Sequence, residues 1–244
     1  MNVNDLPLHY KLVYIALLSC FKSKEVSICT TRLRARLFSS HPLLDIQLLK
    51  CLEKYGAIET KPLSTSSKKV ETEREVFIAG DNSDKPSTHA QRLLSDARDQ
   101  LKDDKSYFKL TDLLLCLLAG ECIEYANFYA ERNGISIVTD VPSFKQTKTM
   151  LNHLSVGQMN MLFWRATQNI PNNDDDRTCQ LEELLELVKS YYIKYTQQGI
   201  KIQNYDRLRS AQPSKLSFLL FHDILKCPER DHLLVGPSSY FDTI

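Results

Sequence analysis

Apolar residues recur three and four positions apart along most of this chain, and this spacing restricts it to a fold built mainly from helices. The chain has 7 glycines in 244 residues. So few glycines argue against a turn-rich all-β sandwich and against glycine-dependent phosphate loops. The helical spacing is clearest in two runs, Leu110, Leu113, Leu114, Leu117, Leu118 and Leu181, Leu184, Leu185, Val188. We therefore expect a mainly α fold.

A polar stretch divides the chain into two parts. Residues 80–87 read Gly-Asp-Asn-Ser-Asp-Lys-Pro-Ser, a cluster of residue types that is typical of loops. We expect a first domain over residues 6–79, a linker over 80–87 and an all-helical domain over 88–244. Because the second part is leucine-rich and mildly acidic, we expect it to mediate self-association or contact with a protein partner.

The first domain is expected to contain three helices, a short strand and a β-hairpin. Its first helix, over 8–21, is apolar on more than one face. A two-turn helix capped by Thr30 or Thr31 should turn Leu33 and Leu37 inward. The remaining elements are a strand at 26–28, a helix from Pro42 to Tyr55, and hairpin strands at 57–61 and 70–78.

The third helix of this domain separates apolar and polar side chains cleanly. Its buried stripe is expected to hold Leu48, Leu49 and Leu52. A polar stripe follows at positions i, i+3, i+4 and i+7, and Gly56 stops the helix. The polar stripe comprises Gln47, Lys50, Cys51 and Lys54.

Two sequence segments resemble the winged helix-turn-helix superfamily of DNA-binding domains. Residues 33–37, Leu-Arg-Ala-Arg-Leu, are similar to its second helix. Residues 48–59 are similar to the end of its recognition helix, in which leucine, leucine-glutamate, glycine and isoleucine recur at fixed spacing. The resemblance covers about a third of the chain. It implies three helices with a small β-hairpin, and a third helix that enters the major groove of duplex DNA.

The distribution of charge agrees with this resemblance. The whole chain has 31 basic and 30 acidic residues, a net charge of +1. Residues 1–80 hold 12 basic and 8 acidic side chains, a net charge of +4, and the remainder has a net charge of −3. Within residues 30–70, 8 basic side chains accompany 3 acidic ones. Basic groups therefore gather where phosphates would lie against a winged helix.

Ten side chains are candidates for contact with DNA. Three lie on the third helix and three at its N-terminus, where hydroxyl and backbone N–H groups suit a phosphate. Two belong to the preceding helix, one turn apart, and two to the hairpin loop. The competing interpretations are a solvated helix face, ordinary helix capping and a charged loop. The candidates are Arg32, Arg36, Ser39, Ser40, His41, Gln47, Lys50, Lys54, Lys68 and Lys69.

The sequence thus predicts a DNA-binding protein that is either a transcriptional regulator or a replication initiator of a mobile element. A homodimer formed through the helical domain would place two recognition helices about 34 Å apart on one face of the DNA. Tyr191 and Tyr195 are candidates for a partner-binding face, whereas Tyr192 suits the core. The alternative is a non-enzymatic adaptor or assembly subunit whose winged helix contacts protein.

Other classes of protein lack support in the sequence. There is no nucleophile elbow, P-loop, zincin or dinucleotide-binding motif, so we expect no enzyme, cofactor or metal site. Seven scattered cysteines without a Cys-x-x-Cys motif indicate reduced thiols in the cytoplasm. No window approaches the roughly 18 uninterrupted apolar residues of a membrane span.

Overall fold

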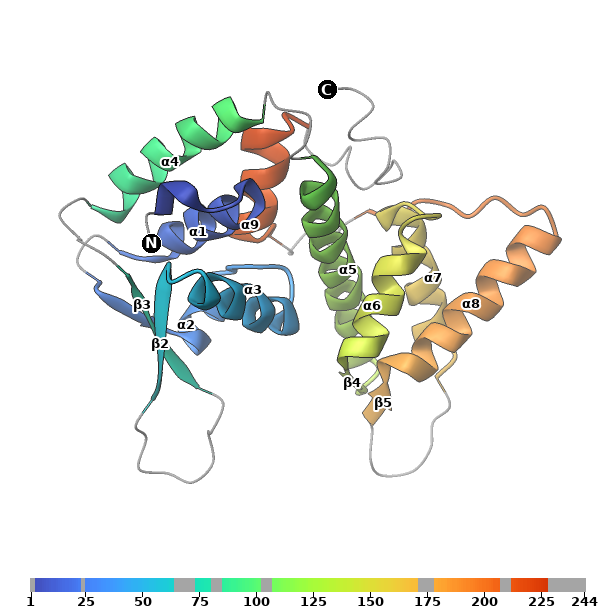
Figure 1. Ribbon diagram of the computed structural model, residues 1–244. Helices are drawn as coiled ribbons and strands as arrows, with labels where there is room; N and C mark the ends of the chain where they lie inside the picture. The colour runs from blue at the N-terminus through green and yellow to red at the C-terminus, as the bar shows by residue number, and fades with distance from the viewer. Residues whose placement is uncertain are drawn as a thin grey trace. The chain divides into compact units, whose positions relative to one another are not determined.

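The protein is mainly helical, as its apolar spacing predicts (Figure 1). The computed structural model describes residues 3–22, 25–63, 73–79, 85–101, 107–170, 178–206 and 212–227. These ranges include a three-stranded antiparallel sheet and a two-stranded parallel sheet. The chain forms two compact units, Met1–Leu113 with Pro213–Ile224, and Leu114–Gln212 with Leu225–Ile244.

Unit 1 contains the segment that resembles a winged helix, together with helices that come later in the chain. Two of these additions, α4 and α9, belong to the region that the sequence assigns to the second domain. The elements of unit 1 are η1 Val3–Asp5, α1 Leu8–Cys20, β1 Ser27–Cys29, α2 Thr30–Ala35, α3 Pro42–Lys54, β2 Ile58–Pro62, β3 Arg74–Ile78, α4 Pro86–Gln100, α9 Lys215–Phe218 and η3 Leu219–Ile224.

Helix α1 lies at the centre of unit 1. Leu12, Val13 and Tyr14 are successive residues that point about 100° apart around the helix, yet each is fully buried. Helices α3, α4 and α9 and the segment η3 all pack against α1. The prediction that this helix is apolar on more than one face is confirmed, and the physical reason is that other elements enclose it on every side.

Helix α4 covers α1 although a polar stretch precedes it in the sequence. It begins at Pro86, inside the predicted linker, with Lys85 as its N-cap. Its buried side chains are Leu93 and Ala97, a narrow apolar stripe that rests on α1. The first compact unit is therefore larger than residues 6–79, because α1 has more apolar surface than that segment alone covers.

A late segment of the chain completes unit 1. The backbone N–H of Lys215 donates to the carbonyl oxygen of Leu37 at 2.6 Å, and that of Leu216 donates to Phe38 at 3.2 Å. Leu216 is fully buried, and α9 packs against α1. The greater part of unit 2, residues 114–212, is consequently inserted in the sequence between two parts of unit 1.

The three strands of unit 1 lie in the order β1-β3-β2. Ile28 of β1 is opposite Val76 of β3, and both are buried. Val76 is in turn opposite Thr60 of β2. One face of the sheet therefore closes the core, whereas the other carries polar and charged side chains.

Helix α2 differs from its prediction in both its cap and its length. The N-cap is Cys29, and no side chain caps the helix. The hydroxyl of Thr30 instead accepts a hydrogen bond from the backbone of Arg74, which ties α2 to the hairpin. Leu33 is buried as predicted, but Leu37 lies beyond the end of the helix with a φ of +54° and is only half-buried.

Unit 2 is helical but, contrary to expectation, not entirely so. Strands β4 and β5 pair in parallel, with Ile137 opposite Cys179. Strands of three residues are too short for an alternating pattern to identify them, and Thr178 begins β5 directly before α8. The elements are the greater part of α5 Tyr107–Arg132, then β4 Ser136–Val138, α6 Val141–Met150, α7 Val156–Thr167, β5 Thr178–Gln180 and α8 Leu181–Gln197.

Helix α5 is long and apolar enough over Lys109–Arg132 to cross a membrane, judged by length and composition alone. Of the helices in the described ranges, no other meets this criterion. Its most apolar window is 61% buried inside the protein, which is how a core helix behaves. The segment also carries the carboxylates Glu121 and Glu124.

The closure of unit 1 by α9 generates a stability prediction. Replacing Leu216 with alanine should lower the free energy of unfolding by about 2–5 kcal/mol, because it leaves a cavity against α1. Amide exchange should accelerate in α1, about 200 residues earlier in the chain. Phe218→Ala, on the exposed side of the same helix, should cost well under half as much. Equal losses in the two variants would contradict the proposed closure.

Candidate nucleic-acid interface

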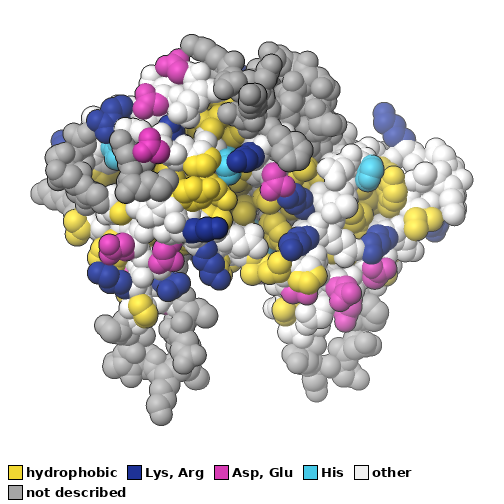
Figure 2. Space-filling model, in the orientation of Figure 1, with side chains coloured by type: hydrophobic (Ala, Val, Ile, Leu, Met, Phe, Trp, Pro, Cys, Tyr) yellow, Lys and Arg dark blue, Asp and Glu magenta, His cyan; other side chains and the backbone are white. Residues whose placement is uncertain are grey.

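Helix α3 presents one exposed face that contains no free carboxylate. Its inward stripe, Leu48, Leu49 and Leu52, is buried as predicted. Gln47, Lys50 and Lys54 are exposed, and Cys51 is half-buried. In Figure 2, basic side chains lie over the region of α3.

Both acidic residues of α3 are engaged by other groups. Asp45 is buried, and it accepts hydrogen bonds from the backbone and the hydroxyl of Ser39. Glu53 accepts from the backbone N–H of Thr60 at 3.2 Å and from its hydroxyl at 2.6 Å. The negative charges of this helix are thus bonded to neighbouring elements, and the cations remain on the outer face.

The N-terminus of α3 is capped from within the protein. His41 is the N-cap, its Nδ1 accepts from the backbone N–H of Leu43 at 3.2 Å, and Pro42 occupies the first helical turn as predicted. Ser39, Ser40 and His41 are all buried. The structure therefore does not bring these three candidates to the exposed face, and their geometry favours the capping interpretation.

Burial shifts the pKa values of His41 and Asp45 in opposite directions. Desolvation lowers the pKa of His41 to about 4, with a further contribution from the nearby charge of Arg34. Desolvation raises the pKa of Asp45, and the hydrogen bonds from Ser39 partly oppose that rise. At neutral pH His41 is consequently an uncharged acceptor, which suits its capping role.

The two candidate arginines of the α2 region have different environments. Arg36 forms a two-pronged pair with Glu25, at 2.5 and 2.8 Å, and also donates to the carbonyl oxygen of Cys20. The hydrogen bond from Arg36 lowers the pKa of Glu25 to about 2. Arg32 is 3.7 Å from the same carboxylate, with 65% of its side chain exposed. Arg36 therefore fastens the end of α1 to α2, and Arg32 is the more accessible cation.

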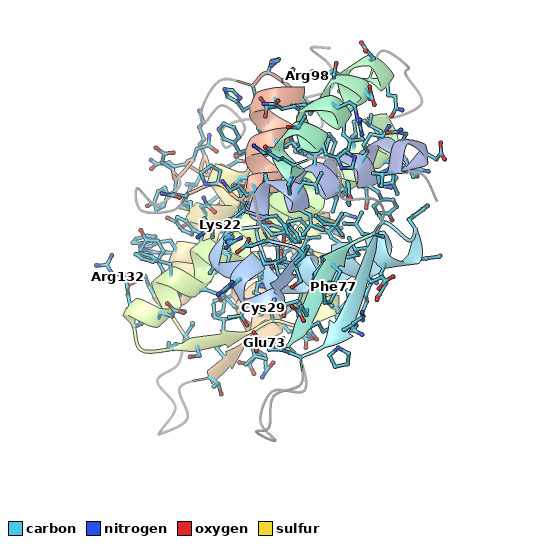
Figure 3. All side chains as sticks on the ribbon, turned by 90° about the vertical axis from the view of Figure 1, so that its left-hand side faces the viewer. Lys22, Cys29, Glu73, Phe77, Arg98 and Arg132 are labelled. Carbon is cyan, nitrogen blue, oxygen red and sulfur yellow. The ribbon has the colours of Figure 1, made fainter. Side chains whose placement is uncertain are left out.

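The outer face of the sheet mixes cations with carboxylates. Lys61 lies 4.8 Å from the ring centroid of Phe77 and 3.9 Å from the carboxylate of Glu59. Figure 3 labels Cys29 on β1, Phe77 on β3 and Glu73 just before β3; Cys29 is opposite Glu75, and Phe77 is opposite Ser27. Glu73 accepts a hydrogen bond from Thr31 at 2.5 Å. The candidates Lys68 and Lys69 lie outside the described residues.

One exposed cation here is absent from the sequence-based candidates. Arg74 begins β3 at the base of the hairpin, opposite Pro62 of β2, and is exposed. Its backbone N–H donates to Thr30 at 3.2 Å, which holds this strand end beside α2. An arginine at a strand end is the local signal that would have identified it.

Aromatic contacts fix the far end of α3 against α1. The hydroxyl of Tyr10 donates to Sγ of Cys51 at 3.4 Å, and its ring lies 5.0 Å from that of Tyr55. The hydrogen bond to Cys51 is the main reason that the pKa of Tyr10 is raised to about 12. Cys51, assigned to the polar stripe by its spacing, therefore serves packing.

Comparison of the chain with protein-family models, with curated proteins and with solved structures found no match. All seven cysteines are free thiols. Within the described ranges, no group of three or more His, Cys, Asp or Glu side chains is arranged to hold a metal ion. The exposed face of α3 is thus the feature of the described residues that carries a candidate function.

The buried cap generates a pH prediction. Because the pKa of His41 falls from 6.5 to about 4 on folding, the unfolded chain binds a proton between these values and the folded chain does not. The stability linked to the uncharged state of His41 is fully present above pH 6.5. It decreases by up to about 3 kcal/mol as the pH falls toward 4.

The variant His41→Asn isolates this effect, since asparagine caps helices well but does not titrate. Unfolding free energies of both proteins should run parallel above pH 7 and converge as the pH falls toward 4. Urea denaturation at a series of pH values measures both curves. Parallel curves over the whole range would show that His41 does not titrate with folding.

Proposed function

We propose that unit 1 is a winged helix that binds duplex DNA through α3. The observation that carries this proposal is the orientation of charge on α3, whose two carboxylates are bonded inward while Lys50 and Lys54 face solvent. The order α1-β1-α2-α3-β2-β3 and the antiparallel pairing of β2 with β3 support the winged-helix assignment. A helix with this face suits the major groove.

The proposed contacts fall into two groups. Gln47, Lys50 and Lys54 lie on α3 and would contact base edges or phosphates in the groove. Arg32 and Arg74 flank the helix and would bind the phosphate backbone, as would the hairpin lysines Lys68 and Lys69. Arg36 is not among the proposed contacts, because Glu25 already neutralises it.

We assign the protein a role as a transcriptional regulator or as a replication initiator of a mobile element, acting in the cytoplasm. Free thiols support that compartment. Self-association through unit 2 would supply the two-fold symmetry that such proteins use on palindromic sites. The far half of α8 supports this, because Ile193 is 53% exposed and Tyr191 stacks on Tyr195.

A second function is favoured by the outer face of the sheet. Glu59, Glu73 and Glu75 lie along this face in the register of β2 and β3, and a duplex would repel them. Such a face suits a protein partner with basic side chains, as in an adaptor or a subunit of a larger assembly. The two functions differ in whether the full chain binds duplex DNA at all.

The DNA-binding proposal predicts a defined dependence on salt. The full-length chain should bind a random duplex at micromolar concentration in about 50 mM salt, with affinity that falls as salt rises. Lys50→Gln and Lys54→Gln should each reduce the slope of log K against log salt by about 0.9 for the phosphate contact removed. Fluorescence anisotropy at four or more salt concentrations measures the slopes.

Lys145→Gln, an exposed lysine on α6 of unit 2, is the matched control and should leave the slope unchanged. If the wild type fails to bind random duplex under these conditions, the DNA-binding proposal is wrong and the adaptor function is favoured. If both α3 variants keep the wild-type slope, the recognition-helix assignment is wrong.

The self-association proposal predicts a dimer that a charge in α8 disrupts. Ile193→Glu should convert the dimer to monomer at micromolar concentration, because the carboxylate would be desolvated in the interface. Sedimentation velocity measures the change. Val26→Glu, which places the same charge at an exposed apolar site in unit 1, should remain dimeric. A wild-type chain that stays monomeric at tens of micromolar would refute the proposal.

A further inference from the structure

One large apolar side chain lies on the exposed face of α3. Ile46 is 49% exposed, whereas Leu44 and Leu48, two positions to either side, are 2% and 6% exposed. It precedes Gln47 and lies one turn before Lys50, so the three side chains share the outward face. The inward stripe already fills the core side of the helix, and therefore Ile46 contributes nothing to packing there.

The chemistry of the major groove specifies what such a face would recognise. The 5-methyl group of thymine is the one apolar group that base edges present in that groove. Glutamine forms a pair of hydrogen bonds with N7 and the N6 amino group of adenine. Isoleucine and glutamine at successive positions thus match thymine and adenine in adjacent base pairs. A G·C pair has no thymine methyl group, and guanine has no amino group beside its N7 in the major groove.

We infer that Ile46 and Gln47 make α3 selective for A·T base pairs, with Ile46 against a thymine methyl and Gln47 on the adenine edge. This inference rests on the proposed binding of duplex DNA by α3. Lys50 and Lys54 supply the electrostatic attraction that holds the helix in the groove, and they carry no part of this selectivity. The thymine methyl group lies in the major groove, so this selectivity requires α3 to read the major groove and not the minor groove.

Uracil provides the decisive probe, because it differs from thymine only by lacking this methyl group. The full-length chain is titrated against fluorescent duplexes of alternating A and T, of alternating A and U, and of alternating G and C. The wild type should bind the A·T duplex most tightly. Binding to the A·U duplex should be about three- to fivefold weaker, which corresponds to the loss of one buried methyl contact.

Matched variants assign the effect to the two side chains. Ile46→Ala should bind the A·T and A·U duplexes equally, and Ile46→Val should keep most of the difference. Gln47→Ala should lose part of the preference for A·T over G·C, the part that the adenine edge supplies, while it remains sensitive to the methyl group. Val138→Ala, an equally exposed apolar site on β4, should reproduce the wild-type ratios. Because all three positions are exposed, thermal unfolding should confirm that each of the four variants folds.

The outcomes separate this inference from the proposed function. Salt-dependent binding with equal affinity for the A·T and A·U duplexes would overturn the selectivity and leave DNA binding by α3 intact. A methyl effect that persists in Ile46→Ala would overturn the assignment to Ile46. Failure to bind any of the three duplexes would overturn the proposed function itself, and Ile46 would then be assigned to a protein contact.

Discussion

The structure of unit 1 depends on the burial of a single helix that has no polar face. Leu12, Val13, Tyr14 and Ile15 point to all sides of α1 and are all buried, and exposing any one side would forfeit the free energy of its burial. Three helices and the segment η3 enclose it. One of these helices, α9, comes from a part of the chain about 200 residues later. The burial of α1 therefore determines which distant segments belong to this unit.

The same constraint shapes the exposed surface of α3. Its apolar stripe rests against the core, its N-terminal turn is capped by His41, and the loop before that turn receives two backbone hydrogen bonds from α9. Asp45 and Glu53 are drawn inward by Ser39 and Thr60. What remains outside is neutral or basic. The charge of the candidate interface thus follows from how the helix is held, and not only from how many lysines it contains.

Local sequence patterns predicted those parts of the fold that are decided within a few residues. The inward leucines of α3, its start at His41 and Pro42, and its end at Gly56 all follow from spacing and backbone preference. The pairing of Arg36 with Glu25 and the place of α4 on α1 depend on residues that are distant in sequence. Periodicity reveals that an amphipathic helix exists, but it does not identify the surface that the helix covers. The exposure of the α3 candidates was accordingly predicted from spacing, whereas the environments of Arg36, Ser39, Ser40 and His41 were not.

The insertion of one unit within the other also affects the order in which the chain can acquire its structure. During synthesis, residues 1–113 emerge first, yet their central helix lacks its last cover until α9 has been made. Residues 114–212, the greater part of unit 2, are made before α9, so most of the later unit is available to fold before the earlier one is complete. Domains are usually completed from the N-terminus onward. In this protein the N-terminal core is completed only when α9 has been made, and the nascent chain must keep an apolar helix from aggregating in the interval.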